Sequence, residues 1–428
     1  MSSTSFWQAE LQETPGLRGV EAVGPLEGDV ETEVAVVGAG ITGTATALWL
    51  ARAGVPVRVL EARHIAAGAS GRNGGFLATG TVEPYARIIE RFGREQARRL
   101  WAASVSNTEL AVELIEELRE QGWFCGYRRN GSLKLAGDEA ELAGIEESVR
   151  LLQEDGRGAE MVTQAALPAR LRSAYVGGSY HPHNAEIQPA KFVLGLARLA
   201  QQAGAMIHEE SPVSGITPDD SGVTLSTERG SVRAHNVVLA TNAWLPALGE
   251  QLGAQWLAQC ITPTRGQMIA TEPVGEQLFP CPCSGDHGYQ YWRQLEDGRL
   301  VVGGWRNYSF ETEYSADETP HETVQRRLDS FVHETLDLPQ LRIERRWAGI
   351  MAFSKDSLPL VGRLPGVPHC YICGGYTGHG NAYALQCARI ISKLVQGRSH
   401  PDDVMLSEAK HLEAHLFDPA RFTSMKER

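Results

Sequence analysis

The 428-residue sequence is short of positive charge. It holds 40 lysines and arginines against 52 aspartates and glutamates, which gives a formal net charge of −12 at pH 7. An acidic chain is repelled by the phosphate backbone of nucleic acids and offers no basic cluster to an anionic lipid surface. The composition therefore argues against nucleic-acid binding, and we expect the charge mainly to keep the protein in solution.

Cysteines and long uncharged runs are also scarce. Seven cysteines, an odd number, favour reduced thiols over a disulfide framework, and residues 1–17 show no secretory signal, so we expect a cytoplasmic protein. Residues 34–51 carry no charge over nearly the length of a bilayer span. Glycines interrupt this run and predict a strand, a turn and a helix, not a membrane span.

A metal site is not expected either. His369, Cys370, Cys373 and His379 are close in sequence. An odd spacing on one strand turns the side chains of Cys370 and Cys373 to opposite faces, which disfavours a shared metal or a disulfide. Buried, apolar behaviour of both thiols is the better interpretation.

A glycine motif is the first strong signal in what is present. Residues 38–43 read Gly-Ala-Gly-Ile-Thr-Gly, after a predicted strand at 33–37 and before a predicted helix at 42–53. Gly38 permits a tight turn, Gly40 lets the backbone approach a pyrophosphate, and Gly43 allows helix and strand to pack closely. The free N–H groups at the helix start favour the phosphates.

An acidic residue completes this motif. Glu61 ends the next predicted strand, 55–60, where a carboxylate can accept hydrogen bonds from a ribose. The motif predicts a bound dinucleotide but does not separate FAD from NAD. Arg63 is also compatible with the 2′-phosphate of NADP.

A second loop of small residues favours FAD over NAD or NADP. Residues 67–75 read Ala-Gly-Ala-Ser-Gly-Arg-Asn-Gly-Gly. With this loop, the sequence from about 31 to 396 resembles the D-amino-acid-oxidase-like family of FAD-dependent amine oxidoreductases, and the loop looks closest to its γ-glutamylputrescine oxidase type. In that family the loop lies along the pyrophosphate and the flavin edge. Small residues suit this role because backbone N–H groups can then reach an anion and a flat ring.

The resemblance implies further cofactor contacts. Residues 237–244 resemble the strand that returns beside the cofactor, and residues 374–380 resemble a turn against the flavin, where a helix N-terminus would stabilise the reduced ring. Val213 matches a position whose backbone meets the adenine. The predicted cofactor-binding residues are Gly38, Gly40, Ile41, Thr42, Gly43, Glu61, Ala62, Arg63, Ala69, Ser70, Arg72, Asn73, Gly74, Gly75, Val213, Thr241, Asn242, Trp244, Gly375, Thr377, Gly378, His379 and Gly380.

Tyr291, Met351 and His379 are the candidate residues of the reaction site. Tyr291 matches a family tyrosine that lines the substrate pocket, whereas His379 between two glycines can either act on the flavin or simply be packed there. Glycine and D-amino-acid oxidases clamp the substrate carboxylate with an arginine where this chain has Met351. We therefore expect larger amines, held by contacts near Tyr291, Trp292 and Met351, to be better substrates than small α-amino acids.

Other features bear on the substrate and the flavin. A carboxylate farther from the nitrogen could still meet Arg265, Arg293 or Arg306. Sarcosine oxidases carry a covalent flavin cysteine near the segment 347–358, but no cysteine stands there, so non-covalent FAD is expected. Their oxygen-activating lysine aligns with Val301, and this leaves an oxidase and a dehydrogenase both open.

The predicted fold class is α/β with α+β: a discontinuous FAD-binding Rossmann-like domain and an antiparallel-sheet substrate domain. We expect the first from residues 31–90, 160–245 and 345–400, and the second from 91–159 and 246–344. Residues 1–30 and 401–428 are predicted as terminal arms. Two domains suit the length, because one compact core seldom grows this large.

The predicted function is FAD-dependent oxidation of the C–N bond of a small amine or amino acid. A hydride passes to the flavin, and the resulting imine hydrolyses. The expected partners are the small-molecule substrate and oxygen or another electron acceptor. The alternatives are an amino-acid dehydrogenase with a non-oxygen acceptor, a flavin monooxygenase, for which we find no second nucleotide motif, and a non-catalytic flavoprotein. The oligomeric state stays open.

Overall fold

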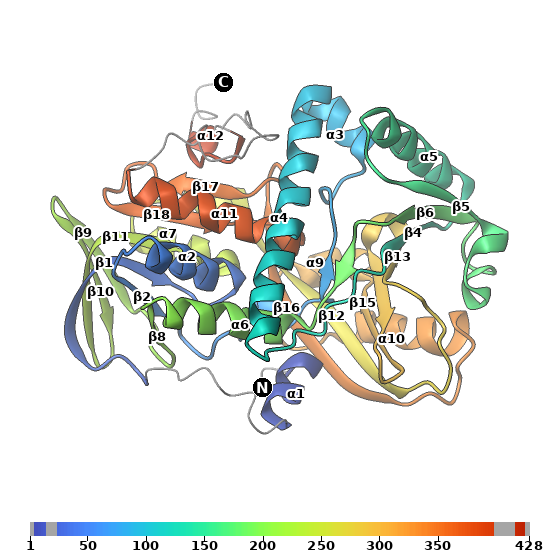
Figure 1. Ribbon diagram of the computed structural model, residues 1–428, viewed down its shortest axis with the longest axis horizontal. Helices are drawn as coiled ribbons and strands as arrows, with labels where there is room; N and C mark the ends of the chain where they lie inside the picture. Colours follow the sequence, from blue (N-terminus) through green and yellow to red (C-terminus); the bar gives the residue numbers. More distant parts are fainter. Residues whose placement is uncertain (1–3, 14–23, 398–415, 424–428) are drawn as a thin grey trace.

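Two eight-stranded sheets form the framework of the protein. The structure, a computed structural model, describes residues 4–13, 24–397 and 416–423. The two sheets occupy different halves of the molecule in Figure 1. A separate short pair, β3 (Phe76–Leu77) with β7 (Ala185–Glu186), lies apart from both sheets.

The first sheet is built around parallel strands. Its order is β17-β18-β11-β1-β2-β8, with β10 and β9 added antiparallel beside β11. Residues 34–37 are buried throughout, as expected for a strand covered on both faces. The strands are β1 (Gly28–Val37), β2 (Val57–Leu60), β8 (Met206–His208), β9 (Gly215–Asp219), β10 (Gly222–Thr227), β11 (Gly230–Leu239), β17 (Leu360–Arg363) and β18 (Cys370–Gly374).

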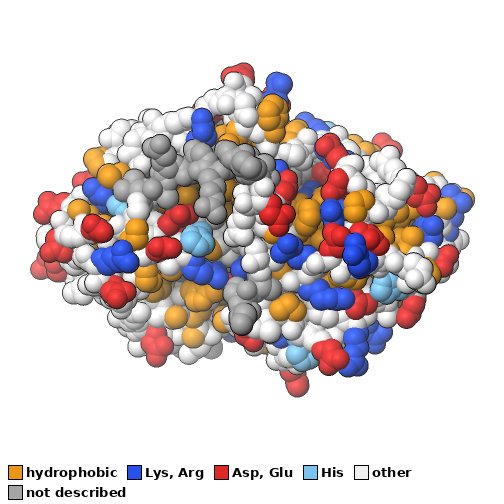
Figure 2. All heavy atoms as spheres, turned by 90° about the horizontal axis from the view of Figure 1, so that it is seen from below, with side chains coloured by type: hydrophobic (Ala, Val, Ile, Leu, Met, Phe, Trp, Pro, Cys, Tyr) orange, Lys and Arg blue, Asp and Glu red, His pale blue; other side chains and the backbone are white. Residues whose placement is uncertain are grey.

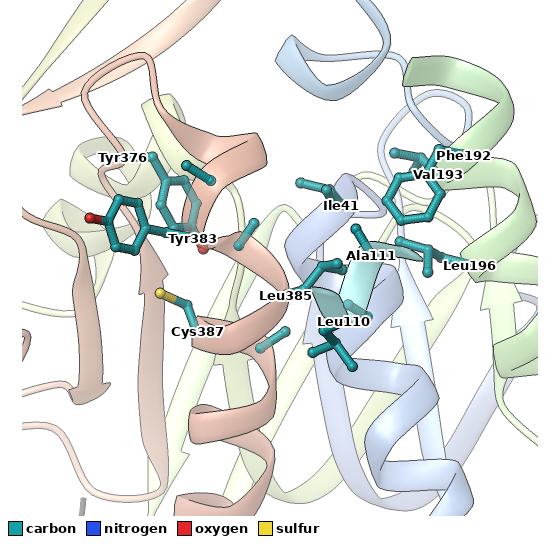
Figure 3. Close-up of a cluster of buried hydrophobic side chains, with 14 of the residues drawn as sticks. Ile41, Leu110, Ala111, Phe192, Val193, Leu196, Tyr376, Tyr383, Leu385 and Cys387 are labelled. Atoms are coloured by element: carbon teal, nitrogen blue, oxygen red, sulfur yellow. The ribbon is translucent and has the colours of Figure 1, made fainter. Parts of the chain in front are cut away.

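Four helices meet in the core beside this sheet. They are α2 (Ile41–Arg52), α4 (Arg94–Glu120), α6 (Pro189–Gln202) and α11 (Gly380–Val395). Figure 3 shows their buried side chains facing one another, among them Ile41, Leu110, Phe192 and Leu385. This core fixes the N-termini of α2 and α11, which both begin at predicted cofactor loops.

The second sheet is largely antiparallel. Its order is β16-β12-β15-β14-β13-β4-β6-β5, and β13 and β4 form its parallel pair. The fold class expected from the sequence is confirmed by these two sheets. The strands are β4 (Ser132–Ala136), β5 (Glu160–Thr163), β6 (Gly177–His181), β12 (Ile261–Pro273), β13 (Cys283–Gly285), β14 (Gln290–Gln294), β15 (Arg299–Gly304) and β16 (Ile343–Ser354).

The two faces of the second sheet differ in character, because side chains alternate along a strand. One face packs into an apolar core that contains Leu133, Cys283 and Trp292. A residue adjacent to each of these, Lys134, Ser284 or Tyr291, therefore points to the other face. This opposite face looks toward the first sheet and forms one wall of the cavity described below.

The remaining helices surround this framework. They are α1 (Phe6–Glu13), α3 (Tyr85–Phe92), α5 (Glu139–Glu154), α7 (Leu245–Gln251), α8 (Leu257–Cys260), α9 (Phe310–Glu313), α10 (Glu322–Ser330) and α12 (Ala420–Thr423). No helix in the described ranges is long and apolar enough to cross a membrane. Acidic and basic side chains are interspersed over the face seen in Figure 2.

Two expectations can be compared with the described elements. Residues 160–181, assigned from the sequence to the FAD-binding segments, supply β5 and β6 to the second sheet, where β6 pairs with β4 and β5 pairs with β6. The predicted arms 1–30 and 401–428 lie partly outside the described residues, but residues 6–13 form the helix α1 and residues 28–30 begin β1.

The cysteine prediction is confirmed. All seven cysteines are free and buried. Cys370 and Cys373 belong to the apolar cores on opposite sides of β18, as their odd spacing predicted. Among the described residues no group of histidines, cysteines and carboxylates is arranged to hold a metal ion.

Candidate active site

A cavity of about 1450 Å³ runs between the two sheets. Both the β1–α2 turn and the polar face of the second sheet line it. The predicted cofactor residues on its wall are Gly38, Gly40, Ile41, Thr42, Glu61, Ala62, Arg63, Ala69, Ser70, Arg72, Asn73, Gly74, Val213, Thr241, Asn242, Trp244, Thr377, Gly378, His379 and Gly380. Gly43, Gly75 and Gly375 stand behind the wall, where they shape the backbone.

The glycines of the first motif are required by close contacts. Gly38 has φ of +101°, and a Cβ on Gly43 would stand 1.8 Å from the carbonyl oxygen of Gly38. A Cβ on Gly40 would stand 2.9 Å from Ser70 Oγ, which itself accepts a hydrogen bond from the Ile41 N–H at 2.9 Å. The start of α2 and the loop at Ser70 thus approach each other closely, and both line the cavity.

Glu61 is held in place by the backbone. Its carboxylate accepts hydrogen bonds from the N–H groups of Ala39 at 2.8 Å and Arg63 at 2.9 Å. Burial raises the pKa of Glu61, while these N–H donors and the Arg63 charge oppose that rise. The carboxylate therefore faces the cavity in a fixed orientation that suits a ribose.

Arg63 is already paired with a carboxylate. Its guanidinium pairs with both oxygens of Glu318, at 2.7 and 3.0 Å, and Arg72 lies 3.5 Å from the same carboxylate. The loop that carries Glu318 leads from α9 to α10 in the second half of the chain. This pairing weakens the interpretation of Arg63 as a partner for the 2′-phosphate of NADP.

The loop at residues 66–75 is braced by α1. Ser5 Oγ donates to the Gly71 carbonyl at 2.6 Å, and Trp7 Nε1 donates to the Asn73 carbonyl at 2.7 Å. The Gln8 amide donates to the carbonyls of Ala66 and Ala67 at 3.0 and 3.1 Å. No pattern in the sequence predicts this brace, because its partners are about 60 residues apart along the chain.

The C-terminal turn joins the same wall. Gly375 N–H donates to Asn242 Oδ1 at 3.1 Å, and Thr42 Oγ1 lies 2.8 Å from the Tyr376 hydroxyl. Among the described residues, the buried Thr241 Oγ1 and His379 Nδ1 have no hydrogen-bond partner. Unsatisfied polar atoms on a cavity wall call for a polar ligand, so this wall fits a dinucleotide such as FAD.

His379 is held uncharged. Burial, with the nearby charges of Lys134 and Arg306, lowers its pKa to about 4, and the Thr377 backbone opposes part of this shift. Near neutral pH the ring can donate or accept one hydrogen bond without adding a charge to the cavity.

Tyr291 and Met351 form a tight apolar corner. A Cβ on Gly266 would stand 2.9 Å from Met351 Cε and 3.8 Å from the Tyr291 hydroxyl, and a Cβ on Gly303 would stand 2.4 Å from the Tyr291 ring. The structure therefore brings Tyr291 and Met351 together, as the sequence analysis expected. Trp292 does not join them, because it points into the core on the opposite face.

The three arginines proposed for a distant carboxylate differ in availability. Arg265 is committed to Glu313, with hydrogen bonds of 2.9 and 3.0 Å. Arg293 donates to the Ile187 carbonyl at 2.7 Å and lies over the Trp7 ring. Arg306 lines the cavity between the rings of Tyr289 and Phe353, and no ion pair to it is found among the described residues.

Sequence reasoning missed a polar group at the far end of the cavity. Lys134, His181, Ser179 and Ser284 line it there, on strands β4, β6 and β13. Their alternation with buried apolar neighbours indicates a polar sheet face. It does not tell whether that face meets solvent or a cavity, since this depends on the packing of distant segments.

A comparison with protein families agrees with this site. The model of the family described as FAD dependent oxidoreductase matches residues 33–394. The chain therefore belongs to this family of FAD-dependent oxidoreductases. The relation seen in the glycine motif and the loop at 67–75 is confirmed over almost the whole chain.

Individual relatives narrow the comparison. The chain is 31% identical to the gamma-glutamylputrescine oxidoreductase of Escherichia coli, over 87% of this chain and 85% of the relative. It is 29% identical to the probable oxidoreductase OrdL of Haemophilus influenzae, over 90% and 86%. The crystal structure of glycine oxidase from Geobacillus kaustophilus has the same fold, with a TM-score of 0.72 at 23% identity, over 86% of this chain and 96% of that one.

Proposed function

We propose that the protein oxidises the C–N bond of an amine with non-covalently bound FAD, and that it does not anchor its substrate by an α-carboxylate at position 351. The observation that carries this proposal is the corner of Met351 and Tyr291, where a thioether and one hydroxyl replace a charged clamp. The name of the E. coli relative, which specifies an amine substrate, supports the same class.

The chain's own residues supply placement and electrostatics. Bound FAD would accept the hydride from the carbon next to the nitrogen. Tyr291, Met351 and Phe353 pack around that carbon and keep water away from it. The uncharged His379 adds a polar contact without a positive charge, and the N–H groups at the start of α11 favour negative charge on the ring.

A flavin monooxygenase is the less favoured function. Such an enzyme needs a place for NAD(P)H, and Arg63, the residue suited to a 2′-phosphate, is paired with Glu318. A separate pocket lined by Glu33, Val34, Val55, Val395 and Gln396 has about 180 Å³, which is too small for a dinucleotide.

Matched pairs of substrates test the proposal. An α-amino acid and the amine that lacks only its carboxylate, such as phenylalanine and phenethylamine or norvaline and butylamine, are compared by kcat/KM and by anaerobic bleaching of the flavin. We expect the amine of each pair to be better. A charged clamp is worth about 1.5–3 kcal/mol and a neutral hydrogen bond about 0.5–1.5 kcal/mol, so the missing arginine should cost the amino acid roughly tenfold.

The matched variant is Met351→Arg, with Met351→Leu as its control. The arginine should improve the α-amino acids relative to the amines, and the leucine should not. If glycine or sarcosine surpasses every simple amine in the unaltered protein, another clamp exists and the proposed substrate class is wrong. If dithionite bleaches the flavin but no amine or amino acid does, the C–N oxidation itself is wrong.

A further inference from the structure

A lysine stands on the wall of the far part of the cavity. Lys134 lines the cavity and is only partly accessible. Among the described residues its ammonium group has no ion pair and no hydrogen bond. Burial lowers the pKa of Lys134, and the Glu141 charge opposes part of this shift. Each oxygen of the Glu141 carboxylate already accepts a backbone N–H, from Gly137 at 2.9 Å and from His287 at 2.6 Å.

The two cross-strand neighbours of Lys134 are polar. They are Ser179 on β6 and Ser284 on β13. Ser179 Oγ lies 3.0 Å from His181 Nε2, and burial lowers the pKa of His181 to about 4, so this ring is uncharged near neutral pH. A partly buried ammonium group beside hydroxyls is stabilised when an anion joins it.

Among the described residues of the cavity wall, Arg306 is the other cation without an ion pair, but its charge is better compensated. Its guanidinium carbon lies 4.5 Å from the centre of the Tyr289 ring and 4.9 Å from that of Phe353. Cation–π contacts of this kind stabilise a charge with no anion present. The positive charge is therefore less well compensated at Lys134 than at Arg306.

The distance from Lys134 to the reaction site can be estimated from the register of the sheet. Lys134 pairs with Ser284, and Ser284 pairs with Tyr291, so two strand spacings separate Lys134 from Tyr291. Each spacing is about 4.8 Å, which places them roughly 10 Å apart along the face of the sheet. An extended chain gains about 1.2 Å per bond, so about eight bonds cover this distance.

We propose that Lys134, with the hydroxyls of Ser179 and Ser284, binds the carboxylate of a substrate whose oxidised C–N bond lies about eight bonds away. This inference rests on the proposed function for the position of the C–N bond. It specifies the substrate class as an amine with a distal carboxylate. It also explains how an enzyme without an arginine at 351 can still select an anionic substrate.

A ladder of chain lengths tests the subsite on the FAD-loaded protein. The probes are ω-amino acids of increasing length, each paired with the n-alkylamine of equal chain length. Binding is measured as Kd from the change in the flavin absorption spectrum, and turnover as kcat/KM. We expect the carboxylate to improve binding about ten- to hundredfold at about eight bonds and to give little or no gain in short chains.

Three variants test whether the gain from the carboxylate depends on Lys134. Lys134→Met should abolish the gain from the carboxylate and leave the alkylamines within about twofold, while Lys134→Arg should retain most of it. Lys355→Met, which removes an exposed lysine outside the cavity, is the matched control and should change neither series. FAD content verifies that each variant has folded.

Several results would overturn the subsite. These are an equal loss for both series in Lys134→Met, loss of the gain in Arg306→Met instead, or no change in the flavin spectrum with any probe. Slower reoxidation of the reduced flavin at unchanged Kd would also overturn it and assign the lysine to oxygen activation. If the probes bind as expected but none reduces the flavin, the subsite stands and the proposed oxidation of this class fails.

Discussion

At the scale of single residues, Gly40 is the position where the cofactor site is most sensitive. A Cβ there would already stand 2.9 Å from Ser70 Oγ. We expect Gly40→Val to abolish FAD binding, because the valine side chain occupies the space where the pyrophosphate approaches the backbone and displaces the Ser70 loop. Flavin absorbance per protein measures the effect.

The control for this prediction is Gly275→Val. A Cβ on Gly275 meets nothing within 4 Å, its φ is not positive, and it lies away from the cavity. This variant should keep its flavin. Circular dichroism should show that Gly40→Val still folds, and a normal flavin content in it would mean that the cofactor lies elsewhere.

Residue patterns also show how far a sequence can predict a site. The alternation of Tyr291 and Trp292 along one strand excludes that both face the cavity, so the expectation of a pocket contact for Trp292 was wrong for a reason visible in the sequence. The role of Lys134 was not visible, because it depends on the pairing of β4 with β13, which are about 150 residues apart. Local geometry is predictable, whereas cross-strand neighbours are not.

At the scale of elements, the helix α1 is the element that the sequence analysis did not predict. Residues 1–30 were expected as an irregular arm, yet residues 6–13 are helical, and Trp7 is 1% exposed. Its ring lies under the Arg293 guanidinium, while its Nε1 bonds to the loop that lines the cavity. The βαβ unit could be predicted because its parts are adjacent in sequence. The contacts of α1 are not adjacent, so the sequence did not reveal them.

We therefore predict that Trp7→Ala lowers both the stability of the fold and the affinity for FAD. Removing a fully buried tryptophan costs about 3–5 kcal/mol of stability, and the loop at 66–75 loses its support. Trp7→Phe, which keeps an aromatic ring but lacks the donor, should cost less. Thermal denaturation and the Kd for FAD measure the two effects.

The comparison variant is Gln12→Ala, on the exposed side of the same helix. It should leave the melting temperature and the FAD affinity unchanged. If Trp7→Ala lowers stability with no change in FAD affinity, α1 supports the fold alone and not the cofactor loop.

At the scale of the whole molecule, the cavity is the interface between the two sheets, and the cofactor should join them. The predicted domain bounds stay a prediction, but both sheets contribute walls to the same space of about 1450 Å³. Glu318, from the loop between α9 and α10, reaches across to Arg63 and Arg72. Binding FAD in this space should therefore stabilise the protein as a whole.

This arrangement predicts that FAD is removable and that its removal destabilises the chain. No cysteine lines the cavity, and all seven cysteines are buried elsewhere, so no thiol is in place to form a bond with the flavin. We expect acid precipitation to leave the yellow colour in the supernatant.

The melting temperature of the FAD-free protein should rise with added FAD, because a ligand at about 100 times its Kd contributes about 2.7 kcal/mol. AMP, which can fill only the adenine end, is the control and should stabilise less. Colour retained in the pellet would contradict non-covalent binding, and equal stabilisation by AMP and FAD would contradict a cofactor that spans both sheets.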